Sequence, residues 1–145
     1  MPDLNKSVVL RYVDVWNSSN FDALDDITHP DYRARRGERL MASGPAALKA
    51  WYSALHNVFP DMKYTVEEIF AVNDRVVVHA SGVGTHLGEW RNNLFTIPPT
   101  GRRVTWSGVD LIRLADGKII EDWDYGDDRG LLERIGTPTY VPKAT

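Results

Sequence analysis

The chain has 145 residues, of which 43% are hydrophobic and 26% charged, and it contains no cysteine. This length and balance fit one compact soluble domain, and the lack of cysteine excludes disulfides, thiol nucleophiles and Cys-ligated zinc. Seventeen Lys and Arg against 20 Asp and Glu give a net charge of −3, so bulk charge favours neither nucleic acid nor a membrane as partner.

The N-terminal residues, Met1 to Lys6, lack the basic and then apolar pattern of a signal peptide, and no apolar run is long enough to span a bilayer. We therefore expect a cytoplasmic protein. A basic cluster interrupted by Glu38 is interpreted as a solvated loop rather than a phosphate-binding surface. It consists of Arg33, Arg35, Arg36 and Arg39.

Three helices are predicted to precede the sheet. The first ends near Asn17, because its apolar residues recur at i, i+3, i+4 and i+7 and share one helical stripe. These residues are Val9, Tyr12, Val13 and Trp16. The second helix is short, with Asn20 as its N-cap and Pro30 as its stop. The third begins at Ser43-Gly44-Pro45, since proline is tolerated in the first turn of a helix, and ends at Pro60.

From Met62 onward, β-branched and aromatic runs alternate with turn residues, which predicts strands. We expect these strands over 64–72, 75–87, 102–114 and 118–125. Asn73-Asp74 and Asp116-Gly117 supply hairpin turns, whereas 88–101 is a long connection in which Pro98-Pro99 excludes a central strand. A short helix over 127–135 closes the chain, with Gly136 at its C-terminal cap.

Helices followed by antiparallel strands imply an α+β domain. Three N-terminal helices would pack on one face of a strongly bent, mainly antiparallel sheet and enclose a pocket. We expect residues 1–136 to form this single domain and residues 137–145 to form a C-terminal tail. Trp123 and Tyr125 would lie on the outer face of the sheet, where a two-fold partner is the simplest cover.

Three carboxylates, Asp110, Asp122 and Asp124, lie on the two strands that flank Asp116-Gly117. In an apolar pocket, desolvation raises the pKa of a carboxyl group and suits it to acid–base chemistry. All three share a face if even positions oppose even positions, as after a three-residue loop with its glycine in the left-handed conformation. A two-residue type I′ turn would instead pair Asp110 with Trp123 and place it on the other face. The sequence leaves both registers open.

Aromatic side chains from helices and sheet are candidates to line a cavity for a flat, apolar ligand. About two of the six are expected to contact that ligand, because aromatic residues at helical spacing are more often core. The six are Tyr12, Trp16, Trp51, Tyr52, Trp90 and Trp106. His79, in the middle of a strand, is a further pocket candidate, with a satisfied core histidine as the commoner alternative. The four histidines fit no metal-ligand spacing, so no metal site is predicted.

Several motifs together resemble the SnoaL-like polyketide cyclase family of the nuclear-transport-factor-2-like superfamily. They are Gly84-Thr85-His86-Leu87-Gly88-Glu89-Trp90, Ile97-Pro98-Pro99-Thr100-Gly101-Arg102, Asp116-Gly117-Lys118-Ile119 with Glu121, Trp123 and Asp124, and Gly130-Leu131-Leu132. The resemblance extends from the helix of Tyr12 to Gly136. It implies a cone made from a curved sheet and three helices, a pocket between them, the even register, and a homodimer formed through the sheets.

The resemblance also implies roles for two carboxylates. In the family's cyclases the Asp at position 124 acts as acid and base in an intramolecular aldol closure, without metal or cofactor. Those cyclases carry His at position 110, where this chain has Asp110. Asp124 and Asp110 are therefore the predicted catalytic residues. The predicted substrate-binding residues are Tyr12, Trp16, Trp51, His79, Trp90, Trp106 and Asp122.

Two function classes follow. The first is a cofactor-free cyclase, isomerase, dehydratase or hydrolase that acts on a small apolar carbonyl compound. The second is a domain that binds an apolar ligand in the same pocket without turning it over. They differ in whether Asp110 and Asp124 point into a closed cavity or are neutralised by neighbours such as Arg102 and Arg113. We favour the enzyme, because unpaired buried carboxylates are costly to keep for binding alone.

Overall fold

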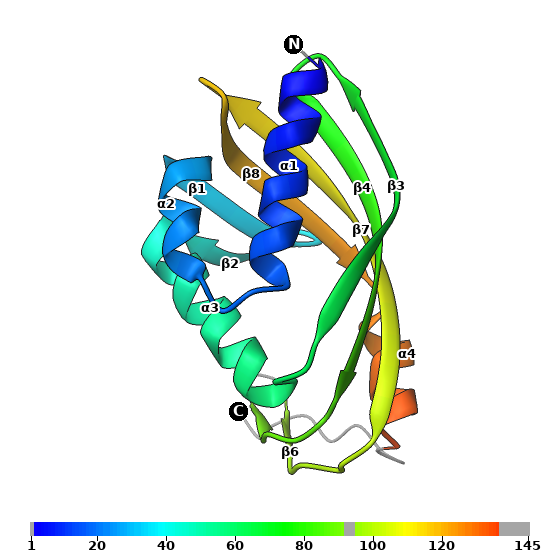
Figure 1. Cartoon of the computed structure of the whole chain (residues 1–145). Helices are drawn as coiled ribbons and strands as arrows, with labels where there is room; N and C mark the ends of the chain where they lie inside the picture. The colour runs from blue at the N-terminus through cyan, green and yellow to red at the C-terminus, as the bar shows by residue number, and fades with distance from the viewer. Residues whose placement is uncertain (1, 92–94, 137–145) are drawn as a thin grey trace.

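The computed structural model describes residues 2–91 and 95–136 (Figure 1). Its helices are α1 (Pro2–Trp16), η1 (Phe21–Ala23, a 3-10 turn), α2 (Leu24–Ile27), α3 (Pro45–Val58) and α4 (Asp128–Ile135). Its strands are β1 (Thr28–Arg36), β2 (Arg39–Ser43), β3 (Lys63–Val72), β4 (Arg75–Thr85), β5 (Trp90–Arg91), β6 (Thr96–Ile97), β7 (Arg103–Ala115) and β8 (Lys118–Gly126). The main sheet has the order β2-β1-β8-β7-β4-β3, while β5 and β6 form a separate ribbon. β1 and β8 are parallel, and the other neighbouring pairs are antiparallel.

The sheet curves around the N-terminal helices (Figure 1). α1 packs on β3 and β4, and α2 and α3 cover the end formed by β1 and β2. Alternate residues of β4 face the helices, so Val76, Val78 and Ala80 are buried in the core. The predicted α+β architecture, with helices packed on one face of a bent sheet, is confirmed.

The order of elements differs from the prediction, because β1 and β2 lie between the second and third helices. All four arginines of the basic cluster therefore belong to strands and not to a loop. Tyr32 and Ala34 are buried, while Arg33 between them is exposed. This alternation is the two-residue period of a half-buried strand, and the arginines on its polar face made it look like a run of surface charge.

The second predicted helix is shorter than expected. η1 and a single turn of α2 end at Ile27, and Asn20 makes no side-chain capping bond. Pro30 lies inside β1, where the pairing with β8 is interrupted between Thr28 and Arg33. The missing N–H of Pro30 therefore breaks no ladder bond.

The turn between β7 and β8 has two residues. Ala115 pairs with Lys118, and the intervening Asp116 and Gly117 have φ of 53° and 75°. Two successive left-handed residues are typical of a type I′ turn. Of the two turns that the sequence left open, the structure therefore has the two-residue type I′ turn and not the three-residue loop.

A β-bulge nevertheless gives the even register, in which Asp110 and Asp124 share a face, which was expected only after a three-residue loop. The pairing shifts after Arg113, which opposes Glu121, so that Ile120 is left as an extra residue. Beyond this bulge Asp110 opposes Asp124. The prediction that these two carboxylates share one face is confirmed, although by a different local structure.

α4 begins and ends as expected. The Asp127 side chain accepts a hydrogen bond from the Gly130 N–H at 2.9 Å, and Gly136 closes the helix with φ of 86°. The connection over 88–101 holds the β5–β6 ribbon, and its residues 92–94 lie outside the described residues, as does the predicted tail over 137–145. None of the described helices has the length and apolar character needed to cross a membrane.

Candidate active site

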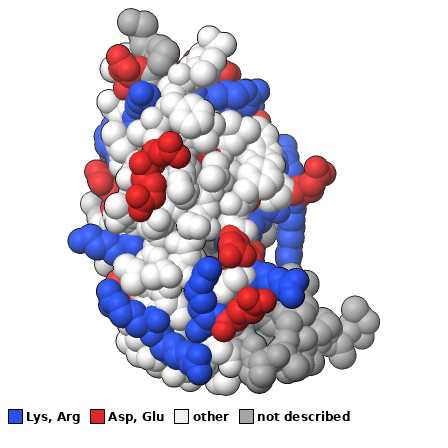
Figure 2. All heavy atoms as spheres, turned by 90° about the vertical axis from the view of Figure 1, so that its right-hand side faces the viewer, with Lys and Arg blue, Asp and Glu red and all other residues white. Residues whose placement is uncertain are grey.

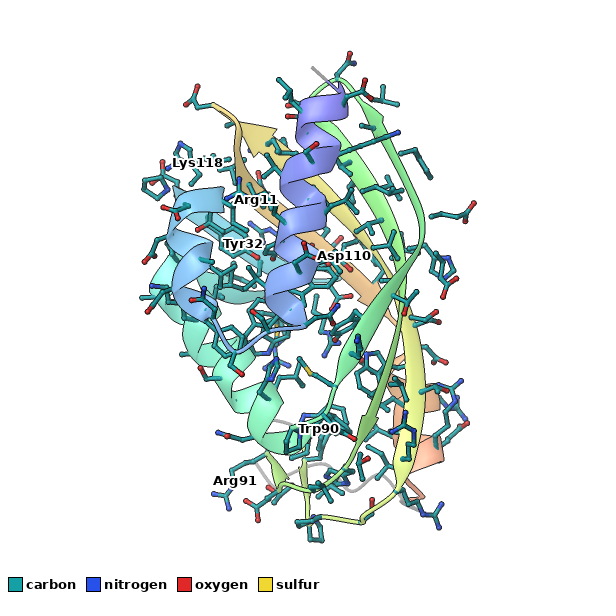
Figure 3. The ribbon with its side chains drawn as sticks, viewed as in Figure 1. Arg11, Tyr32, Trp90, Arg91, Asp110 and Lys118 are labelled. Atoms are coloured by element: carbon teal, nitrogen blue, oxygen red, sulfur yellow. The ribbon has the colours of Figure 1, made fainter. Side chains whose placement is uncertain are left out.

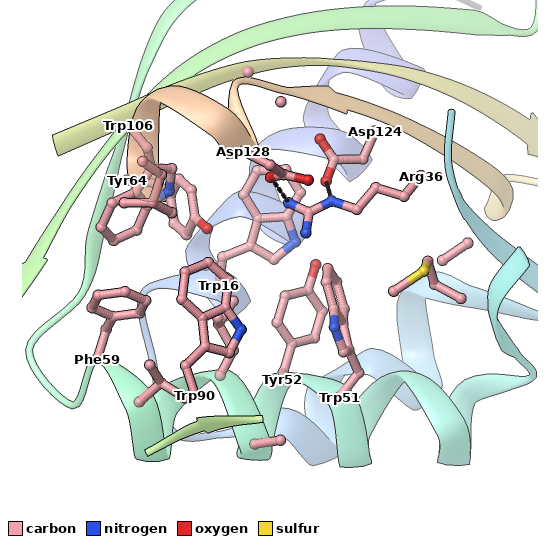
Figure 4. A pocket seen from close by; sticks show the side chains of 18 of the residues that line it. Trp16, Arg36, Trp51, Tyr52, Phe59, Tyr64, Trp90, Trp106, Asp124 and Asp128 are labelled. Carbon is pink, nitrogen blue, oxygen red and sulfur yellow. Dashed lines mark hydrogen bonds and ion pairs between the residues drawn. The ribbon is translucent and has the colours of Figure 1, made fainter. Parts of the chain in front are cut away.

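A pocket of about 430 Å³ lies between the concave face of the sheet and α3 (Figure 4). Its volume is in the range of small-molecule sites. Figure 4 shows aromatic side chains around it, from α1, α3, β3, β5 and β7 and from the residue that follows α3. These are Trp16, Trp51, Tyr52, Phe59, Tyr64, Trp90 and Trp106. Five of the six predicted aromatic residues thus line the pocket, and Tyr12 is the exception.

Three carboxylates enter the pocket wall from two strands. Asp110 is on β7, Asp122 and Asp124 are on β8, and all three line the cavity. Asp122 is buried, whereas Asp110 and Asp124 keep partial exposure where they face the cavity. Figure 3 shows Asp110 in the interior, between α1 and the sheet.

Burial dominates the ionisation of this cluster. Desolvation, then the charge of Asp122 and a hydrogen bond with it, raises the pKa of Asp110 well above its ordinary value. Desolvation also raises the pKa of Asp122 to about 6, while hydrogen bonds from Asp110 and Tyr12 oppose that rise. Like charges at close range therefore favour a state in which one carboxyl group of this pair is ionised and the other is protonated.

Arg36 modifies the third carboxylate. Its Nε lies 3.2 Å from Asp124 Oδ2, and its terminal nitrogen lies 3.1 Å from Asp128 Oδ1, at the start of α4 (Figure 4). Desolvation raises the pKa of Asp124, and the charge of Arg36 opposes that rise. Arg102 and Arg113, the anticipated neutralising neighbours, do not line the pocket, and Arg113 pairs with Glu121 instead.

Two predicted pocket residues lie elsewhere. His79 occupies an odd position of β4, opposite the exposed Val109, and approaches Glu68 at 3.9 Å. Its side chain therefore faces away from the helices, because odd and even positions of the strand point to opposite faces. Tyr12 is fully buried behind the pocket wall and does not line the cavity.

Tyr12 instead contacts the carboxylate cluster from behind. Its hydroxyl donates to Asp122 Oδ2 at 2.8 Å and lies 2.7 Å from the hydroxyl of Tyr32, which comes from β1. Both tyrosines are fully buried.

Arg36 and Tyr32 are site residues that were not predicted. Both lie on β1, where Arg36 belongs to the basic cluster interpreted as a loop and Tyr32 directly precedes that cluster. The signal that would have found them is the alternation of Tyr32, Ala34 and Arg36, which places the three side chains on one face of a strand.

Gly82 creates space for one pocket wall. A Cβ at this position would overlap the indole ring of Trp106, on the neighbouring strand. Close packing against an aromatic ring thus explains the glycine at position 82.

Within residues 2–91 and 95–136, no group of His, Cys, Asp and Glu side chains is arranged to hold a metal ion. The ionisable side chains at the carboxylate end of the pocket include those of Asp110, Asp122, Asp124 and Arg36.

Comparison with known proteins identifies related sequences. The family model described as SnoaL-like polyketide cyclase matches residues 6–135. The nogalonic acid methyl ester cyclase of Streptomyces nogalater is 30% identical over 130 residues, which cover 87% of this chain and 92% of that protein.

Solved structures show the same fold. The structure of a candidate SnoaL-like polyketide cyclase from Jannaschia sp. CCS1 has a TM-score of 0.83 and 26% identity, covering 95% of both chains. That of AclR, a candidate hydroxylase from Streptomyces galilaeus, has a TM-score of 0.82 and 31% identity, covering 99% of this chain and 91% of AclR.

Proposed function

Because the chain belongs to the SnoaL-like polyketide cyclase family, we propose that it closes a ring in a flat, apolar carbonyl compound, or catalyses a related isomerase or lyase reaction, by cofactor-free acid–base chemistry. The observation that carries the proposal is the cluster of Asp110, Asp122 and Asp124 in the wall of an aromatic pocket. Burying carboxylates costs free energy, which acid–base catalysis explains better than binding of an apolar ligand does.

The protonation states of the cluster suit an aldol closure. Asp124, beside Arg36, is the base that removes a proton from the carbon next to a carbonyl group. The enolate carbon then attacks a second carbonyl, and a carbon–carbon bond forms. Asp110 gives its proton to the new alkoxide, and transfer of the abstracted proton from Asp124 back to Asp110 closes the cycle.

The walls of the pocket favour a planar substrate that carries oxygen. Trp51, Trp90 and Trp106 offer ring surfaces for stacking. The carboxyl groups of Asp110 and Asp124, which line the same cavity, offer hydrogen bonds to substrate oxygens when protonated. We propose a small apolar organic substrate, rather than nucleic acid or a membrane, and a cytoplasmic homodimer as the working form.

The experiment is incubation of the purified protein with nogalonic acid methyl ester, the compound in the name of the Streptomyces nogalater relative. A cyclised product has the mass of the substrate but a different retention time and NMR spectrum. A product heavier by one oxygen atom would instead support hydroxylation, the activity in the description of AclR. Absence of both binding and turnover would reject this substrate class.

The non-catalytic alternative has one observation in its favour, the ion pair between Arg36 and Asp124, because a neutralised carboxylate is a weaker base. Saturable binding of the ester without conversion, in wild type and in Asp124→Asn alike, would support the binding domain.

A further inference from the structure

The tyrosine hydroxyls behind the pocket have a defined direction of hydrogen bonding. Tyr12 has a single hydroxyl proton, which it donates to Asp122 Oδ2. The 2.7 Å contact between the two hydroxyls must therefore be a bond in which Tyr32 donates and Tyr12 accepts. Burial raises the pKa of both tyrosines well above the ordinary value, so each keeps the proton it donates.

The other oxygen of Asp122 completes the chain. Oδ1 is buried, and no N–H or hydroxyl group among the described residues bonds to it. Asp110 lies within hydrogen-bonding reach of Asp122, and only the protonated form of its carboxyl group can donate. Two donors, from Tyr12 and Asp110, would satisfy both oxygens of an ionised Asp122, whereas a protonated Asp122 could not accept as well from both.

We propose that Tyr12 and Tyr32 are positioning residues that act through Asp122 to keep the proton on Asp110, the carboxyl group that faces the pocket. The relay runs from Tyr32 to Tyr12 to Asp122, and Asp110 donates to Asp122 from the opposite side. Tyr12 and Tyr32 never touch the substrate. Their effect is to make Asp122 the ionised member of the pair, which leaves its neighbour as the acid.

Other charged or titratable groups surround the pair, and of these Tyr52 hydrogen-bonds to Tyr12 and not to Asp122. They are Tyr52 from α3, Tyr64 from β3, Arg36 from β1 and Asp124 from β8. Arg36 forms its ion pairs with Asp124 and Asp128, and the structure gives no hydrogen bond from it to Asp122. Tyr12 is thus the side chain whose hydroxyl bonds directly to Asp122.

The role of the Asp110 proton as the catalytic acid rests on the proposed function. The relay itself does not, because it can be measured without a substrate. The measurement is ¹³C NMR of the aspartate carboxyl carbons between about pH 4 and pH 9, with Asp110→Asn and Asp122→Asn used for assignment. In the wild type we expect Asp122 to ionise first and Asp110 to remain protonated at neutral pH.

Removing hydroxyls one at a time should produce a graded response. Tyr12→Phe removes a hydrogen bond to the ionised Asp122, so the pKa of Asp122 should rise by about one pH unit or more. The proton of the pair should then be divided between Asp110 and Asp122. Tyr32→Phe should produce a smaller shift in the same direction, because it acts one bond further away. Tyr64→Phe is the control, since it removes the hydroxyl of a partly buried tyrosine that bonds to Trp106 and not to Asp122, and the pKa of Asp122 should not move.

The proposal is overturned if Asp110 ionises before Asp122, or if Tyr12→Phe and Tyr64→Phe leave the Asp122 step in the same place. If Tyr12→Phe does not fold, Tyr32→Phe against Tyr64→Phe makes the same comparison. If the wild type shows no turnover but Asp122 still ionises before Asp110, the catalytic proposal alone is contradicted. A change of the titration in Tyr12→Phe tests the relay even if the protein turns over no substrate.

Discussion

At the scale of single residues, Asp124 is the side chain whose replacement separates catalysis from binding. Asp124→Asn preserves the shape of the side chain but removes the base, so turnover should fall by about 100-fold or more while ligand affinity changes little. The measurement is kcat together with the dissociation constant of a substrate that has been shown to react. Asp127→Asn is a useful control at the rim of the pocket, because this residue caps α4 and bonds neither Asp110 nor Asp124. A fully active Asp124→Asn protein would make the carboxylate structural and favour the binding domain.

The raised pKa of Asp110 should make the folded protein less stable as pH rises. Its pKa is raised in the folded state, mainly by desolvation, so the folded protein binds this proton more tightly than the unfolded chain does. The stabilisation from this protonation is complete below about pH 4 and is lost as pH rises through the raised pKa. Asp110→Asn stays neutral, and we expect it to exceed the wild type in free energy of unfolding by about 1–3 kcal/mol near pH 8 but not near pH 4.

Urea unfolding at the two pH values measures this difference. Asp116→Asn, in the exposed turn between β7 and β8, should follow the wild type at both. An Asp110→Asn protein whose advantage did not grow with pH would show that Asp110 is already ionised in the folded state.

At the scale of elements, the close approach of β4 and β7 shapes the pocket. Gly82→Ala would place a methyl group where the indole ring of Trp106 lies, so the ring must move. Because overpacking of this kind costs about 1–3 kcal/mol, we expect lower stability, altered near-ultraviolet circular dichroism and weaker ligand binding. Ser81→Ala, one residue earlier and on the other face of β4, should change none of the three. Normal affinity in Gly82→Ala would mean that Trp106 does not contact the ligand.

At the scale of the whole molecule, the outer face of the sheet carries exposed apolar side chains. Phe70, Val109 and Tyr125 are 54%, 39% and 57% exposed, on β3, β7 and β8. Figure 2 shows this side of the molecule, where uncharged surface lies between scattered acidic and basic side chains. Exposed apolar surface of this kind favours association with a second copy through a two-fold interface.

We therefore expect a dimer in sedimentation velocity at micromolar concentration. Tyr125→Glu should shift the protein towards monomer, because it places a charge in the proposed interface. Leu4→Glu is the matched control, since Leu4 is 66% exposed but lies on α1. A wild-type protein that sediments as a monomer would contradict the proposal.

Whole-molecule topology also limited what could be predicted. The spacing of Val9, Tyr12, Val13 and Trp16 identified α1, and Asp116-Gly117 identified the hairpin of β7 and β8, because periodicity and turn chemistry are properties of short segments. The same local reasoning failed for β1 and β2, where outward-facing arginines concealed a strand whose other face joins the core.

The sequence by itself determined the class of fold, the family resemblance and the presence of Asp110, Asp122 and Asp124 on two neighbouring strands. Only the tertiary structure decided how they are paired. The bulge at Ile120 sets the register, and Arg36 meets Asp124 from a strand 88 residues earlier in the chain. Register and long-range partners depend on how distant segments pack, and the desolvation that raises the pKa of each carboxyl group exists only once those segments enclose the pocket.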